Sequence, residues 1–131
     1  MGKAQEIKKL DAALSKYVRS SNADDSGYTS CFTCGVSKPW KQLDCGHFMG
    51  RSKYATRWLY DLDAGLVNVM PQCKRCNMTN GGQQYLYGQR LDERFGKGTA
   101  DRIMQMSNQP SKHNLHDLIE WRKGYEEKLK G

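Results

Sequence analysis

The sequence is poor in apolar residues and has no long apolar segment. Hydrophobic residues make up 37% of its 131 residues, and no run approaches the roughly 20 apolar residues that a membrane-spanning helix needs. The opening residues, from Met1 to Glu6, are polar and charged, unlike the apolar centre of a signal peptide. We therefore expect no membrane association and a reducing, cytoplasmic location.

Acidic residues are also scarce, since 14 Asp and Glu stand against 21 Lys and Arg, for a net charge of +7. This excess suits a polyanion such as nucleic acid, although many small basic proteins have no such partner. There is no internal repeat, and no segment has clear helix-turn-helix spacing, so nothing indicates a transcription factor. The length fits a single domain, and the low apolar content predicts that a cross-link supports it.

Four cysteines form two CxxC pairs, Cys31 with Cys34 and Cys73 with Cys76. Each pair can bring two thiolates to one side of a tight turn, and four thiolates are a standard structural zinc site. Four unrelated buried cysteines are the plainer interpretation, but two such pairs in so short a chain favour zinc. Cys45 fits neither pair and is interpreted as a small buried residue.

The hydrophobic periodicity predicts an α+β fold. The expected helices cover residues 3–19, 83–95 and 99–106, with a short helix from residue 76 or 77 and a last one from residue 114. Residues 20–30 are expected to be a loop, and residues 36–60 mainly a β-hairpin with a long connection. Tyr85 is an expected core contact, Thr99 and Asn114 are expected helix caps, and His113 and His116 are expected at the surface.

Side chains suited to phosphodiester hydrolysis lie between and beside the cysteine pairs: Asp44, His47, Asn68 and Asn77. A neutral histidine can act as a general base near neutral pH. The oxygens of Asp44 and Asn77 suit Mg²⁺ or Mn²⁺, hard ions that keep several of their waters. A lone histidine in a hairpin is more often structural, but His47 is accompanied by the other elements of a site.

Basic residues flank these candidates. Arg51, Lys53 and Arg57, here called the basic cluster, follow His47, and Lys74 and Arg75 lie inside the second cysteine pair. If His47 is catalytic, a DNA backbone passes close to these positions, so we expect all five side chains to contact phosphates. An ordinary solvated loop is the alternative interpretation of the basic cluster.

Together these motifs resemble an HNH (ββα-metal) endonuclease and, within that superfamily, the phage lambda NinG (Rap) recombination endonuclease family. The resemblance is carried by Cys31-Phe-Thr-Cys34-Gly, Asp44-Cys-Gly-His47-Phe, Arg51, Asn68, Gln72-Cys-Lys-Arg-Cys76-Asn77 and Gly96-Lys-Gly-Thr-Ala-Asp-Arg-Ile103. It implies a single domain over residues 1–131. Residues 1–30 would be a helix and loop, residues 31–82 a zinc-bound ββα core, and residues 83–131 helices packed around that core.

The resemblance also implies a function and a role for each site residue. The protein would be a metal-dependent, structure-selective DNA endonuclease that cuts branched intermediates such as Holliday junctions and D-loops during phage recombination in the host cytoplasm. His47 would be the general base, Asp44 and Asn77 would bind Mg²⁺ or Mn²⁺, and Asn68 would brace the hairpin loop. A homodimer is expected, because symmetric cutting of a junction needs two active sites. The alternative is a non-catalytic zinc module that binds DNA or another protein, which does not require Asp44, His47 and Asn77 to converge.

Overall fold

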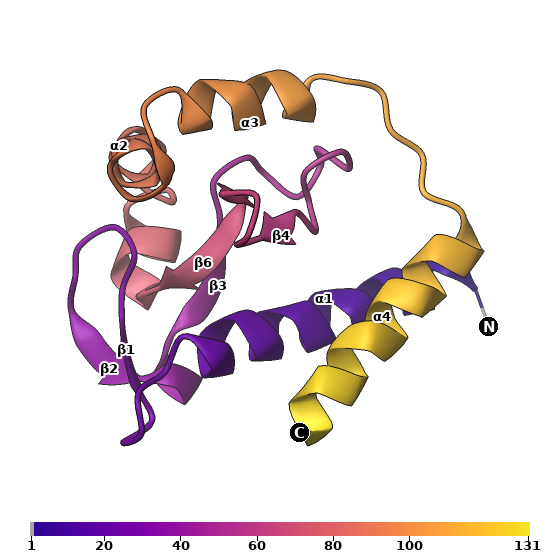
Figure 1. Cartoon of the computed structure of the whole chain (residues 1–131), viewed down its shortest axis with the longest axis horizontal. Helices are drawn as coiled ribbons and strands as arrows, with labels where there is room; N and C mark the ends of the chain where they lie inside the picture. Colours follow the sequence, from indigo (N-terminus) through magenta and orange to yellow (C-terminus); the bar gives the residue numbers. More distant parts are fainter. Residues whose placement is uncertain (1) are drawn as a thin grey trace.

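The computed structural model describes residues 2–131 and has an α+β fold (Figure 1). The helices are α1 (Lys3–Ser21), α2 (Gln84–Phe95), α3 (Thr99–Ser107) and α4 (Leu115–Lys130), with the short helical turns η1 (Trp40–Gln42) and η2 (Arg75–Thr79). The strands are β1 (Tyr28–Ser30), β2 (Ser37–Pro39), β3 (Asp44–His47), β4 (Tyr60–Asp61), β5 (Leu66–Val67) and β6 (Val69–Gln72). No helix in residues 2–131 combines the length and the apolar character that crossing a membrane requires.

In the described residues the strands form separate antiparallel pairs rather than one continuous sheet. β1 pairs with β2, and β4 pairs with β5. The central pair is β3 with β6, in which Asp44 lies opposite Gln72 and His47 lies opposite Val69. The chain therefore runs from β3 through a long connection, which contains β4 and β5, into β6 and then into η2.

β6 separates two hydrophobic clusters. Val69 packs with Leu10 and Leu14 of α1 and with Leu118 of α4, whereas the next residue, Met70, packs in the cluster of α2 and α3. Side chains alternate between the two faces of a strand, so each cluster takes one face of β6, and all four of its residues are buried. The β3–β6 pair thus lies between α1 with α4 on one side and α2 with α3 on the other, as Figure 1 shows.

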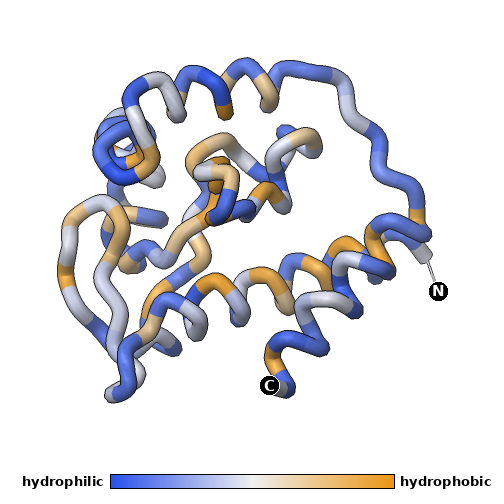
Figure 2. Tube along the Cα trace, viewed as in Figure 1, coloured by the Kyte–Doolittle hydropathy of each residue, from blue (hydrophilic) through white to orange (hydrophobic). Residues whose placement is uncertain are grey.

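α4 crosses α1 and closes one side of the molecule (Figure 1). Hydrophobic and hydrophilic residues alternate along α1 (Figure 2), as expected of an amphipathic helix. An ion pair joins the two helices, in which Arg122 Nε donates to Glu6 Oε2 over 2.8 Å and the Glu6 side chain is only 3% exposed. Asn114 caps α4 as predicted, since its side chain accepts from the amide of Asp117.

The predicted hairpin within residues 36–60 is wrong. β3 lies in that range, but its partner is β6, and β1 also falls in the expected loop of residues 20–30. β6 is buried on both faces, so its sequence lacks the alternation of a half-exposed strand. In the sequence, residues 66–70 therefore stand out only as a short apolar run.

Two side-chain assignments in the C-terminal half are also wrong. Tyr85 is 82% exposed, whereas Tyr87 is completely buried and donates its hydroxyl to the carbonyl of Gly46. Thr99 does not cap α3, because it is already the first helical residue. Asp92 of α2 accepts from the amide of Ala100 instead, since a carboxylate is a strong acceptor at a helix N-terminus.

Candidate metal centre and active site

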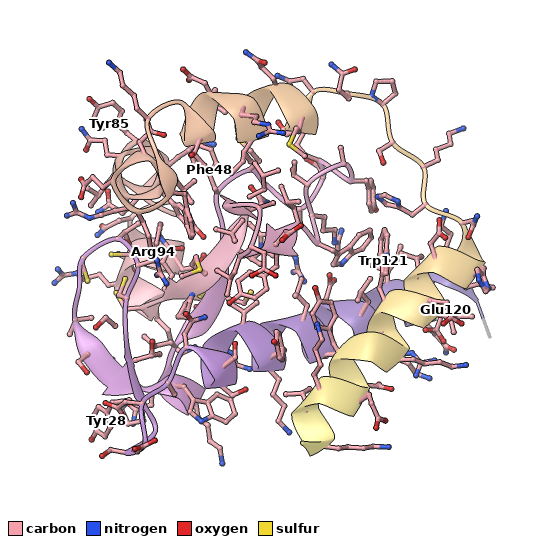
Figure 3. All side chains as sticks on the ribbon, in the orientation of Figure 1. Tyr28, Phe48, Tyr85, Arg94, Glu120 and Trp121 are labelled. Carbon is pink, nitrogen blue, oxygen red and sulfur yellow. The ribbon has the colours of Figure 1, made fainter. Side chains whose placement is uncertain are left out.

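The four paired cysteines come together at one edge of the molecule, where sulfur atoms gather in Figure 3. Cys31 and Cys34 lie in the turn between β1 and β2, and Cys73 and Cys76 lie at the junction of β6 with η2. Their Sγ atoms all lie within 4.8 Å of one another. The amide of Cys34 donates to Cys31 Sγ, and the amide of Cys76 donates to Cys73 Sγ. This is the donor set and the turn geometry that can bind one zinc ion.

The thiols differ in acidity. Burial would raise the pKa of Cys31, but hydrogen bonds from the amide of Cys34 and the hydroxyl of Thr33 outweigh it and lower the pKa to about 6. Burial and the neighbouring thiols raise the pKa of Cys76 to about 12. At neutral pH a bound zinc ion therefore has to displace protons from this site. Cys45, outside the tetrad, is partly buried and packs beside the α1 cluster, and burial raises its pKa to about 12.

Asp44 and Asn77 meet in a cleft of about 500 Å³ between α1, β3 and η2. Asn77 Nδ2 donates to Asp44 Oδ2 over 3.0 Å, and Lys74 Nζ donates to Asp44 Oδ1 over 2.6 Å. Burial alone would raise the pKa of Asp44, but the hydrogen bonds from Lys74 and Asn77 and the charge of Lys74 outweigh it and lower the pKa. Asp44 is therefore an ionised carboxylate that faces the cleft.

His47 is the last residue of β3 and lines the same cleft. Its Nε2 lies 3.0 Å from the carbonyl oxygen of Arg57. A carbonyl only accepts, so Nε2 carries the proton and Nδ1 keeps its lone pair. Burial lowers the pKa of His47 to about 4, and the charges of Arg51 and Arg57 act in the same direction. The imidazole is therefore neutral at neutral pH and has a proton acceptor at Nδ1.

Two fully buried side chains fix the backbone around His47. Asn68 accepts from the amide of Met49 at 2.8 Å and donates to the Met49 carbonyl at 3.0 Å, which ties down the chain just after β3. Gln72 lies against Gly46, where an added Cβ would come within 1.9 Å of Gln72 Oε1. Glycine is required at position 46 for this close approach, which accounts for the residue that immediately precedes the histidine.

The three residues of the basic cluster differ in how exposed their side chains are. The Arg57 side chain is only 13% exposed and binds Asp11 through Nη2 at 2.6 Å and Nε at 3.2 Å. Arg51 shares Asp11 at 3.0 Å but is 61% exposed. Lys53 is exposed and donates to Asn108 at 3.4 Å. Phosphate contacts by these residues, and by the exposed Lys74 and Arg75, stay predictions. Arg57 differs from the other four, because an ion pair already engages most of its guanidinium.

The family model described as the bacteriophage lambda NinG protein matches residues 2–131. The chain belongs to the bacteriophage lambda NinG family. No curated protein and no solved structure gives a significant match to it. The NinG match confirms the family to which the cysteine pairs and the motifs around Asp44, His47 and Asn77 point.

Sequence reasoning missed residues of α1 and η1 that shape the cleft of this NinG-family chain. Asp11, Arg19 and Lys41 all line it. Asp11 also accepts from Trp58 Nε1 over 2.7 Å, so α1 holds the loop that follows His47. A signal for Asp11 was present, since it falls three and seven residues before Leu14 and Val18 on the apolar face of the helix. A carboxylate in that position needs a cationic partner.

Proposed function

We propose that this protein is a metal-dependent, structure-selective DNA endonuclease of the HNH (ββα-metal) type, which hydrolyses phosphodiester bonds in branched recombination intermediates. The observation that carries the proposal is the convergence of Asp44, His47 and Asn77 on one cleft. A zinc module that only binds DNA or protein would not require these side chains to meet. Family membership supports the phage recombination setting.

His47 is the general base. Its neutral imidazole is oriented by the Arg57 carbonyl, so Nδ1 accepts the proton of a water that attacks phosphorus in line with the leaving oxygen. Orientation by a backbone carbonyl fixes the tautomer and keeps the acceptor nitrogen available. The products are a 5′ phosphate and a 3′ hydroxyl.

Asp44 and Asn77 are the residues that fit a hard divalent cation. They offer an ionised carboxylate and a side-chain amide within one hydrogen bond of each other, the oxygen donors that Mg²⁺ and Mn²⁺ prefer. When bound, such an ion neutralises charge on the phosphate and on the leaving 3′ oxygen. Asn77 donates to Asp44 through Nδ2, so its amide oxygen is the atom left for the ion.

DNA is held by the positive charge around the cleft. Arg19, Lys41, Arg51 and Lys74 line it, and Lys53 and Arg75 are exposed nearby in sequence. These side chains supply sequence-independent contacts to phosphates. A homodimer would present two such clefts, as symmetric cutting of a four-way junction requires.

The test is cleavage of a panel of linear, forked and four-way DNAs by zinc-loaded protein with magnesium or manganese. The proposal expects cutting of the branched DNAs, faster than cutting of the linear duplex and absent without the divalent ion. Binding to DNA with no cutting under any of these conditions would reject the nuclease and leave the non-catalytic zinc module.

A further inference from the structure

A second hollow, distinct from the catalytic cleft, is walled by aromatic rings. Its volume is about 210 Å³, and its lining includes Tyr54, Trp58, His113, Trp121 and Tyr125. We call this the aromatic pocket. Figure 3 shows Trp121 on the side of α4 that faces the strands, away from Glu120. Tyr54 is 42% exposed and Trp121 is 39% exposed, so the pocket is open to solvent.

The rings are held in contact with one another. The centroid of the His113 ring lies 4.9 Å from that of Trp121 and 5.6 Å from that of Trp58, and both pairs are edge to face. The ring centroids of Tyr54 and Trp58 are 5.9 Å apart. The sequence predicted His113 to be a surface residue, but in the structure its ring packs against two tryptophans. Its Nε2 lies 3.1 Å from the carbonyl oxygen of Tyr54. The pocket is thus built where the loop after His47 meets the segment that leads into α4.

The surroundings of the aromatic pocket are cationic. A neighbouring hollow shares Tyr54, Trp58 and His113 and continues to Lys3 and Lys112. The Arg57 guanidinium lies 5.4 Å from the centroids of both the Tyr54 and the Trp58 rings. Asp61 is the acidic residue of the lining. A ligand with a flat π-system on an anionic backbone fits this combination, whereas a cationic ligand would be repelled by Lys3 and Lys112.

The size of the pocket further limits the kind of ligand that can fit. At about 210 Å³ it is smaller than the roughly 300–1,000 Å³ of pockets that hold drug-sized molecules, so it suits a single ring system. Duplex DNA keeps its bases stacked and cannot insert a single base into the pocket. An unpaired strand can, and proteins that bind unpaired strands combine aromatic stacking platforms with basic side chains along the phosphates.

We propose that the aromatic pocket binds one unpaired nucleobase of a DNA strand, with Trp121 and Tyr54 as stacking partners and Lys3 and Lys112 near the adjoining phosphates. The choice of DNA as the ligand rests on the nuclease function proposed above. Asp61 can accept a hydrogen bond from a base edge.

Arg57 connects this pocket to the catalytic cleft. Its guanidinium lies at cation–π distance from the two pocket rings Tyr54 and Trp58, while its carbonyl oxygen orients His47. A base held in the pocket is therefore next to the segment that positions the general base. Unpaired bases occur at gaps, flaps and opened branch points, so the pocket selects DNA in which such a site lies beside the bond to be cut.

The experiment measures binding by the zinc-loaded protein without magnesium or manganese, so that it does not depend on cutting. Fluorescence anisotropy compares a linear duplex with the same duplex containing a short single-stranded gap, and 2-aminopurine in the gap reports stacking through loss of its fluorescence. Trp121→Ala and Tyr54→Ala are expected to weaken binding of the gapped DNA roughly 5- to 100-fold, to leave duplex binding unchanged and to restore the 2-aminopurine signal.

Matched variants keep the result specific. Trp121→Phe retains a stacking ring and is expected to bind gapped DNA nearly as the wild type does. Tyr85→Ala removes a tyrosine that is 82% exposed on α2 and is expected to have no effect. Thermal melts of each variant establish that the fold persists.

Two results would overturn the nucleobase pocket. One is that Trp121→Ala and Tyr54→Ala bind gapped DNA as the wild type does, and the other is that they lose affinity equally for gapped and duplex DNA. Protein that binds the gapped DNA through these rings but never cuts would reject the nuclease and keep the pocket. If the protein cuts DNA but the two alanine variants bind gapped DNA as the wild type does, the nuclease is kept and the pocket is rejected.

Discussion

At the scale of single residues, Asp44 is shared between Asn77 and the ammonium of Lys74. A divalent cation that binds Asp44 has to compete with that ammonium. Lys74→Ala is therefore expected to tighten Mn²⁺ binding by roughly 2- to 5-fold, the value of a largely exposed ion pair of up to about 1 kcal/mol. Isothermal titration of Mn²⁺ into zinc-loaded protein without DNA measures this directly.

Arg75→Ala is the matched control for Lys74→Ala, because it removes an equal charge from the adjacent exposed position. It is expected to change Mn²⁺ affinity less. Unchanged or weaker Mn²⁺ binding by Lys74→Ala would show that Lys74 does not compete for Asp44.

Residues that belong to a short motif with characteristic spacing were predictable from the sequence. The cysteine tetrad is one example, since two CxxC pairs define it without knowledge of the fold. The division of the basic cluster was not predictable from the sequence. Arg51 and Arg57 both pair with Asp11, which precedes Arg57 by 46 residues, but only Arg57 is buried in that contact. Ion pairs between distant segments leave no periodic signal in the sequence.

At the scale of elements, α1 braces the loop that follows His47 through Asp11, which accepts from Arg57 and Trp58. Burial would raise the pKa of Asp11, but these hydrogen bonds and the charges of Arg57 and Arg51 outweigh it and lower the pKa below its ordinary 3.8. The ionised carboxylate therefore adds stability above about pH 3.8, and this contribution is lost as the pH falls through the lower folded pKa.

Asp11→Asn is accordingly expected to lower the free energy of unfolding by about 1.5–3 kcal/mol at neutral pH, the range for hydrogen bonds to charged groups. The difference from the wild type should shrink as the pH is lowered past about 3.8. Urea titrations across this pH range measure it, with Asp63→Asn as an exposed carboxylate control. A pH-independent difference would mean that packing, and not charge, is what Asp11 contributes.

The exposed part of the basic cluster gives a second prediction at this scale. Arg51→Gln with Lys53→Gln is expected to weaken binding to all DNAs alike and to lower the slope of log affinity against log salt by about 1 for each phosphate that the protein no longer neutralises. Arg57→Gln should instead lower thermal stability, since its guanidinium is paired with Asp11. An unchanged salt slope in the double variant would identify the cluster as a solvated loop.

The helices were easier to predict than the strands. α1 and α2 begin and end close to the predicted positions because their apolar stripes are long and regular. The partner of β3 was missed because β6 is only four residues long and is buried on both faces. The cap of α3 was misassigned because Asp92 reaches it from α2, a contact that only the tertiary structure creates.

At the scale of the whole molecule, two modest hydrophobic clusters lie on either side of β6, and the cysteine tetrad joins β1 and β2 to η2. With so little apolar mass, metal binding is expected to supply much of the folding free energy. Protein purified without added zinc should contain about one equivalent. Removal of the zinc by a chelator, or the substitution Cys73→Ser, should cause loss of the cooperative thermal transition.

Cys45→Ser is the control for the zinc prediction, because Cys45 lies outside the tetrad, and it should retain the metal. Metal analysis and calorimetry together decide the matter. A metal-free protein that melts normally, or a disulfide between any two of the four cysteines, would contradict the zinc site.

The most direct test of the proposed active site is a single-turnover cleavage assay on a four-way DNA with His47→Ala and Asp44→Ala at low and high Mn²⁺. If His47 is the general base, His47→Ala is expected to lose roughly 10²–10⁴-fold in rate, to keep its melting temperature and DNA affinity, and not to be rescued by Mn²⁺. Asp44→Ala should also lose activity but recover part of it at high Mn²⁺, because its defect is in ion binding. His47→Ala protein that melts early yet cuts at the normal rate per folded molecule would rule out His47 as the general base and favour the non-catalytic zinc module.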